Sequence, residues 1–180
     1  MADTALEIHI RPLRREDDRS SFRCGNIELD RFFQRFAGQN QFRHHIGTTY
    51  VAVQGKHIAG FATVSSGELT ATSLSKHPHK KLPAYPMPIL RIARLAVNEL
   101  HQGLGIGKLL LRAMLALALE MRDKTGCTGV VVDAKPETIP FYEKLGFQPL
   151  ELASGALGEH PEPVAMFLPI TVIGNAAPTD

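Results

Sequence analysis

The sequence predicts an α/β fold, and three patterns carry that prediction. Residues 89–97 read as an apolar strand that runs directly into a glycine-rich turn and then into a long helix with one apolar face. Residues 130–132 are three consecutive valines, a run expected of a strand that is covered on both faces. Residues 48–53 and 57–65 are β-rich runs joined by Gln54-Gly55-Lys56, which indicates a hairpin.

The remaining elements of the first half follow from periodicity. Residues 7–13 alternate apolar and polar side chains and predict an edge strand. A helix capped by Asn26 should follow, because aromatic and aliphatic residues recur there every three or four positions; we expect this stripe in the core rather than in a ligand site. The stripe consists of Leu29, Phe32, Phe33 and Phe36. Residues 66–88 carry four prolines and should form a loop, not a central strand.

The second half is punctuated by glycine and proline. A helix over residues 105–122 should stop at Gly126, and Pro136 should open a short helix that Gly146 ends. The strands expected here are residues 127–133, 147–152 and 164–170.

Length and composition predict a single domain. The chain has 180 residues, 44% of them hydrophobic, so it can bury a proper core. We expect one domain over residues 1–173 and a loose tail over 174–180. No secretory signal is evident, and the longest apolar run, residues 113–119, is too short to span a bilayer. These features predict a cytoplasmic protein that does not engage a membrane and whose two cysteines are reduced.

Formal net charge is only +2, but basic residues gather in one proline-containing loop. Such a loop is either a solvated surface or a contact for nucleic acid, and Lys76, Lys80 and Lys81 are the candidate substrate-binding residues. His77 and His79 lie in the same loop, yet no second ligand pair stands at a suitable spacing, so we expect no metal site.

The glycine turn after residue 97 indicates phosphate binding. Glycines at 103, 105 and 107 can adopt positive φ and leave room for a ligand beside the amides of the first helical turn. Leu109 stands where the phosphate-loop motif needs Ser or Thr, and the dinucleotide fingerprint also fails. The alternative is a tight turn with a purely structural role.

The spacing of this turn resembles the pyrophosphate motif (Q/R)-x-x-G-x-(G/A) of the GNAT superfamily of acetyl-CoA-dependent N-acetyltransferases. Gln102, Gly105 and Gly107 match it, and residues 141–147 resemble the F-Y-x-x-x-G-F segment near the end of the same domain. The resemblance implies a mixed, twisted sheet whose central strands splay to admit acetyl-CoA as co-substrate, without a metal.

The same resemblance implies a set of site residues. The pyrophosphate would rest on Gln102, Gly103, Leu104, Gly105, Ile106, Gly107 and Lys108. The pantetheine arm would pair with the strand edge formed by Leu95, Ala96 and Val97. Tyr142 would protonate the departing thiolate, and Phe141 would serve cofactor binding by packing; the alternative for Tyr142 is a packed core residue.

No carboxylate is singled out as general base, although Glu99 and Asp133 end strands near the expected cleft. At pH 7 an α-amine of pKa ~7.8 is roughly 15% neutral, whereas a lysine of pKa ~10.4 is only about 0.04% neutral. An α-amine substrate could therefore react without a base.

A narrower resemblance is to the GNAT toxins of bacterial toxin–antitoxin pairs. It is carried by residues 22–33, with the pattern C-G-x-x-x-L-D-x-F-(L/F), and by residues 94–97 and 132–134. It implies acetylation of the α-amine of charged tRNA and inhibition by a small antitoxin, commonly of ribbon-helix-helix type. The alternatives are a small-molecule or protein-amine acetyltransferase, or a coenzyme A-binding module acting through partners. The sequence leaves open whether the chain forms a homodimer.

Overall fold

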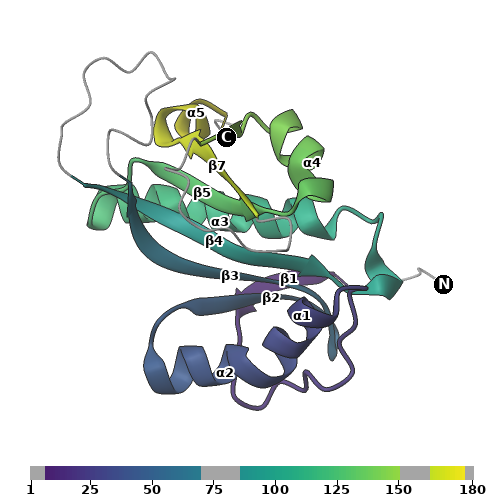
Figure 1. Ribbon diagram of the computed structural model, residues 1–180. Coiled ribbons are helices and arrows are strands. Elements are labelled where there is room, and N and C mark those ends of the chain that lie inside the picture. Colours follow the sequence, from purple (N-terminus) through teal and green to yellow (C-terminus); the bar gives the residue numbers. More distant parts are fainter. Residues whose placement is uncertain (1–6, 70–85, 151–162, 177–180) are drawn as a thin grey trace. The chain divides into compact units, whose positions relative to one another are not determined.

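The computed structural model describes residues 7–69, 86–150 and 163–176. Within these ranges the strands form one mixed sheet with the hydrogen-bonded order β1-β2-β3-β4-β5-β7-β6, and helices flank it (Figure 1). The predicted α/β class is confirmed. The chain divides into two compact units, unit 1 with residues 1–65 and 93–114, and unit 2 with residues 66–92 and 115–180.

Unit 1 begins with an antiparallel meander of three strands. β1 (Ile8–Pro12) pairs with β2 (Thr48–Gln54), and β2 pairs with β3 (His57–Leu69), whose residues up to Ser65 belong to this unit. Gly55, with φ of 61°, turns the hairpin between β2 and β3. The hairpin and the position of the first strand at the edge of the sheet are as predicted.

One helical stretch with two π turns lies along β2 and β3 in Figure 1. Its segments are α1 (Ile27–Arg31), η1 (Phe32–Phe36), α2 (Ala37–Gln39) and η2 (Asn40–His44). Asn26 caps it as predicted, because its side-chain oxygen accepts a hydrogen bond from the amide of Leu29 at 3.0 Å. The stretch ends at His45, which adopts a left-handed φ of 53°.

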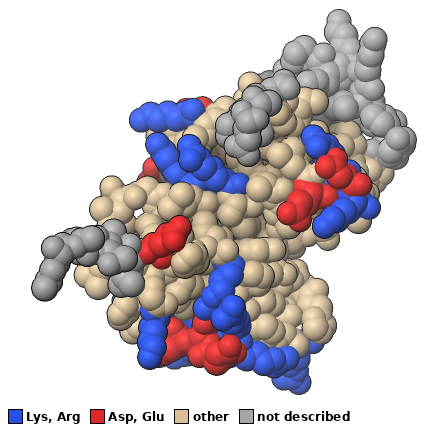
Figure 2. Space-filling model, turned by 180° about the vertical axis from the view of Figure 1, so that it is seen from behind, with Lys and Arg blue, Asp and Glu red and all other residues tan. Residues whose placement is uncertain are grey.

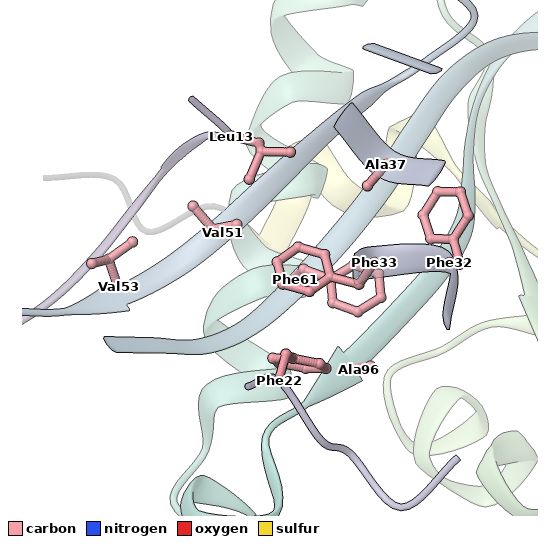
Figure 3. Packing of buried hydrophobic residues seen from close by; sticks show 9 residues of the cluster. All are labelled: Leu13, Phe22, Phe32, Phe33, Ala37, Val51, Val53, Phe61 and Ala96. Atoms are coloured by element: carbon pink, nitrogen blue, oxygen red, sulfur yellow. The ribbon is translucent and has the colours of Figure 1, made fainter. Parts of the chain in front are cut away.

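Aromatic rings fill the core of unit 1 (Figure 3). The Phe33 ring stacks on Phe61 with centroids 4.4 Å apart, and Phe22 meets both rings edge-on. The predicted stripe is correct for Phe32 and Phe33, which are buried, but wrong for Phe36, which is 46% exposed. The wider π turn over residues 32–36 breaks the three- and four-residue periodicity on which the prediction rested.

The second chain segment of unit 1 carries the glycine turn. The last residues of β4 (Met87–Val97) lead through η4 (Glu99–His101) into α3 (Ile106–Lys124). Helix α3 approaches β3 closely at Gly60, where a β-carbon would lie 3.0 Å from a methyl of Leu110 and 3.2 Å from a methyl of Ile106. This contact fixes where α3 starts, and with it the end of the turn.

Unit 2 is built around one parallel and two antiparallel pairs of strands. Residues 90–92 of β4 run parallel to residues 130–132 of β5 (Gly129–Ala134), and β7 (Val164–Pro169) lies between β5 and β6 (Gln148–Pro149). The three valines of β5 are fully buried, as predicted. The helices among the described residues of this unit, besides the end of α3, are η5 (Pro136–Thr138), α4 (Ile139–Lys144) and α5 (Ile170–Ala176).

Several predicted boundaries need correction. The expected loop over residues 66–88 is too long, because β3 extends to Leu69 and β4 starts at Met87. Pro88 fits in this strand because its carbonyl still accepts hydrogen bonds from the amide and hydroxyl of Thr128. The expected strand over residues 147–152 is reduced to two described residues, and helix α5 was not predicted. Gly126, with φ of 101°, follows α3 as expected. The extent of the single domain and the splay of its central strands stay predictions.

No helix in the three described ranges is long and apolar enough to cross a membrane. Both cysteines are thiols, and Cys127 is buried.

Candidate functional site

Two of the three glycines in the turn adopt the conformation that the sequence suggests. Gly103 has φ of 79° and Gly105 has φ of 83°. A β-carbon at either position would meet no other atom within 4 Å, so both glycines border open space. Both glycines are therefore needed for the left-handed backbone and not for close packing inside the protein, and they leave room for a ligand.

The expectation of positive φ at Gly107 is wrong, because this residue lies in the first turn of α3. The first α-helical bond of α3 runs from the amide of Leu109 to the carbonyl of Gly105 at 3.1 Å. The preceding amides, those of residues 106–108, have no carbonyl one turn earlier in the helix to accept them. They are the donors that an anion would find at this helix start. Lys108 is exposed beside them.

Gln102 uses its side chain to hold the turn. Its Nε2 donates to the carbonyl of Val97 at 3.1 Å and to the carbonyl of Cys24 at 3.0 Å. The first bond ties the turn to the end of β4, and the second ties it to the segment that precedes α1. The carboxamide thus links two parts of unit 1, and we call this link the bracket. The backbone of Gln102 remains part of the expected pyrophosphate site, which we call the socket.

The segment before α1 completes this bracket. The amide of Cys24 donates to the buried carboxylate of Asp30 at 2.8 Å, and the amide of Glu99 donates to the carbonyl of Arg23 at 2.8 Å. Gly25, with φ of 90°, makes the bend between them. The structure therefore gives a physical role to the C-G-x-x-x-L-D pattern: it seats the start of α1 against the glycine turn. Sequence reasoning missed these contacts, although the fixed spacing of Cys24, Gly25 and Asp30 was a signal.

The strand edge expected to receive the pantetheine arm is partly engaged. Ala96 is buried in the core of unit 1 and its carbonyl approaches Gly60 of β3, while the carbonyl of Val97 accepts from Gln102. Backbone polar groups of consecutive strand residues face opposite edges, so those of Leu95 face away from β3. Pairing of an arm with residues 95–97 stays a prediction, and Leu95 is its best-placed member.

Tyr142 lies on α4, where its ring is buried and its hydroxyl is available. The residue is 6% exposed, and its ring packs edge-on against Phe141 at 5.1 Å and Phe147 at 5.5 Å. Within the described part of the chain its hydroxyl makes no hydrogen bond, so that oxygen can serve a bound molecule. Burial raises the pKa of Tyr142 to about 12, which keeps the phenol protonated at any physiological pH. Phe141 supports this ring, and its contact with a cofactor stays a prediction.

The two carboxylates considered as bases lie in different settings. Asp133 of β5 forms an ion pair with Arg91 of β4, with the Nη2 of the arginine 3.2 Å from Oδ1. Glu99 is exposed in the first turn of η4, and its Oε1 lies 3.6 Å from where a β-carbon on Gly25 would be. The Asp133 carboxylate is thus held by an ion pair, whereas that of Glu99 lies beside the bend at Gly25.

The candidate substrate loop, with Lys76, Lys80 and Lys81, lies outside the described residues. Elsewhere, charges of both signs are interspersed over the face in Figure 2. Among the described residues no three His, Cys, Asp or Glu side chains converge as a metal site would require.

Comparison with known proteins gives the same picture. Residues 45–149 match the family described as acetyltransferase (GNAT) domain. The tRNA-acetylating toxin of Mycobacterium tuberculosis is 27% identical over 133 residues, which are 73% of this chain and 79% of that protein. The protein named Probable toxin TacT in Sinorhizobium fredii is 27% identical over 96% of this chain and 97% of its own length. The solved structure of AtaT complexed with acetyl-methionyl-tRNAfMet is similar with a TM-score of 0.79 and 25% identity, covering 94% of this chain and 98% of AtaT.

Proposed function

This chain belongs to the acetyltransferase (GNAT) family, and from that premise we propose that it is a toxin that acetylates the α-amine of aminoacyl-tRNA and so blocks translation. It is an acetyl-CoA-dependent N-acetyltransferase. The observation that carries the choice of substrate is the likeness to toxins over nearly the whole chain, including one solved with an acetylated aminoacyl-tRNA. A charged tRNA also presents the amine chemistry that a site without a dedicated base can use.

The glycine turn is the proposed seat of the acetyl-CoA pyrophosphate. The amides at the start of α3 can donate hydrogen bonds to an anion, and Lys108 adds a positive charge. The absence of side chains at Gly103 and Gly105 leaves room for that anion. Gln102 and the segment before α1 hold this socket in place before any ligand arrives. A preformed socket saves the free energy of ordering a loop on binding.

Tyr142 is the proposed proton donor. The neutral amine attacks the thioester carbon, a C–N bond forms, the C–S bond breaks, and the sulfur leaves as a thiol by taking the hydroxyl proton of Tyr142. The attacking nitrogen loses its surplus proton to solvent, from which Tyr142 is protonated again. With a pKa of about 12 this phenol is a weaker acid than a thiol of pKa ~8.5, so its hydrogen bond to the developing thiolate matters as much as full proton transfer.

The proposal extends to partners and place of action. A protein that stops translation acts where tRNA is charged, in the cytoplasm, and must be restrained by a small antitoxin, for which a ribbon-helix-helix protein is the candidate. The resemblance to toxin–antitoxin proteins supports these statements.

The decisive experiment measures transfer of labelled acetyl from acetyl-CoA to a pool of charged tRNAs. We expect label on aminoacyl-tRNA, and Tyr142→Phe should lower kcat by about 10²-fold or more while acetyl-CoA affinity is retained, because only a proton donor is removed. Uncharged tRNA is the control. Label that appears on small amines or proteins, but not on charged tRNA, would replace the toxin proposal with a general N-acetyltransferase.

A further inference from the structure

Acidic residues are missing from a long part of unit 1. Between Asp30 and Glu68 the sequence contains no Asp or Glu, although it contains four Arg or Lys residues and three His residues. The helical stretch α1 to η2 lies mostly in this interval. From Arg31 onward its exposed charged side chains are therefore all basic, whereas Glu28 in its first turn is an exposed acid.

Three arginines of that stretch follow one another at spacings of four and eight residues. Arg31, Arg35 and Arg43, with Gln39 between them, are all exposed, and we call these four residues the arginine row. In a regular α-helix each step of four residues overshoots a full turn by about 40°, so three steps would carry the last side chain about 120° around the axis. The wider turns of η1 and η2 counteract this drift. The π turns therefore help to align the row along one line of about 18 Å.

No direct ion pair neutralises these arginines among the described residues, although Glu28 lies on the same helix one turn before Arg31. Arg15, from the loop after β1, adds a further cation next to the row, because its guanidinium lies 4.7 Å from the ring of Phe42. Two carboxylates of that loop are engaged elsewhere, Asp17 with the side chain of Arg11 and Asp18 with Ser20, while Glu16 is exposed beside Arg15.

The row also has a fixed relation to the glycine turn. The start of α1 is bonded to the turn through Gln102 and Glu99, so the helix that carries the row leads away from the predicted acetyl-CoA socket within the same unit. Phe36, 46% exposed next to Arg35, offers a ring on which a base could stack.

We propose that the arginine row, with Arg15, binds the phosphate backbone of the tRNA substrate. The choice of tRNA as the bound molecule rests on the proposed function. Guanidinium groups bind phosphate oxygens through two parallel hydrogen bonds, and a line of them follows a nucleic-acid strand without reading its sequence. The surface thus positions any tRNA, and leaves the choice of amino acid to the rest of the site.

The test compares three triple variants of the full chain. The first changes Arg31, Arg35 and Arg43 to Ala, the second changes them to Lys, and the control changes Arg112, Lys124 and Lys144 to Ala, which removes the same charge from exposed positions elsewhere. The affinity of each for bulk deacylated bacterial tRNA is measured across a range of salt concentrations. Acetyl-CoA affinity is measured in parallel.

For the first variant we expect at least a tenfold loss of tRNA affinity. The slope of the logarithm of the binding constant against the logarithm of the salt concentration should be smaller in magnitude by about two to three, because each lost phosphate contact removes about 0.7–0.9 from that slope. The Lys variant should keep most of the slope, the control should keep both properties, and acetyl-CoA affinity should stay unchanged in all three.

Wild-type tRNA affinity in the first variant, or an equal loss in the control, would overturn the proposal. So would a first variant that binds tRNA normally but escapes its antitoxin, since the row would then be a protein interface. If the row variant loses tRNA binding while wild-type protein transfers no acetyl group to charged tRNA, the binding surface stands and the proposed function fails.

Discussion

At the scale of residues, glycines in this chain serve two different purposes. Gly103 and Gly105 are needed for backbone shape and face open surroundings, whereas Gly129 of β5 is needed for packing, because a β-carbon there would lie within 2.5 Å of the Leu168 carbonyl. Sequence patterns identified the glycines of the turn and the Asn26 cap, since both obey local rules. They misjudged Gly107 and Phe36, whose conformations depend on where α3 begins and on a π turn.

The first prediction concerns Gly105→Glu. A carboxylate at the start of α3 should repel the pyrophosphate, so we expect acetyl-CoA affinity to fall by about 10²-fold or more; the new side chain enters open space, although φ of 83° strains any residue other than glycine. Calorimetry on the purified variant measures this. Gly55→Ala is the matched control: it introduces similar strain at φ of 61° in the β2–β3 hairpin and should leave acetyl-CoA affinity intact. Unchanged affinity in Gly105→Glu would remove the pyrophosphate from this turn.

At the scale of elements, the main gain over the sequence is the bracket between η4, the glycine turn and α1. Gln102 and Cys24 are 78 residues apart, and no periodicity or spacing in a single chain reports a hydrogen bond between them. The elements themselves were largely predictable because their caps, turns and apolar faces are local. The sequence thus predicted the parts of the socket, but not what holds them together.

The second prediction tests this bracket at Gln102. Gln102→Glu replaces the donor with an oxygen that faces two carbonyls, so we expect acetyl-CoA affinity to fall about tenfold, equivalent to about 1.4 kcal/mol. Gln102→Arg restores donors and should recover most of the loss. The KM for acetyl-CoA should rise in the Glu variant while kcat changes little, because the side chain holds the socket and does not touch the reacting atoms.

A second substitution tests whether Gln102 supports the turn or contacts the phosphate directly. Asp30→Asn weakens the hold on Cys24 from its other side, at a distance from the socket. If both residues act through Cys24, their effects on acetyl-CoA affinity should be coupled by more than about 0.5 kcal/mol. Additive effects would mean that Gln102 acts on the ligand directly.

At the scale of the whole molecule, each unit has a core of its own. Unit 1 is centred on stacked aromatic rings, and unit 2 on aliphatic and aromatic side chains of β4, β5 and β7. The sequence predicted the α/β class and most strands, because hydrophobic runs report burial. It did not divide the chain in this way, since β4 and α3 each contribute to both units and look continuous in sequence.

The third prediction concerns stability in alkaline solution. The pKa of Tyr142 is raised by burial from 10 to about 12, so the folded state holds its proton more tightly than the unfolded state. The associated stability is fully present below about pH 10 and is lost as the pH rises towards 12. Denaturant unfolding from pH 8.5 to 11.5 should therefore show a steeper decline in wild-type protein than in Tyr142→Phe. Parallel curves for the two proteins would contradict a buried, titrating phenol.

The position of β7 has a consequence for the order in which the sheet is assembled. It is the last strand along the described residues, yet it lies in the interior of the sheet, bonded to β5 along six residues and to β6 on its other side. Strands β5 and β6, and the helix α4 that carries Tyr142, all precede β7 in the sequence, so β5 and β6 are joined into one sheet only once β7 has been inserted between them. This unit therefore folds through non-local pairing, which has to close a loop first and is slower than the formation of local contacts.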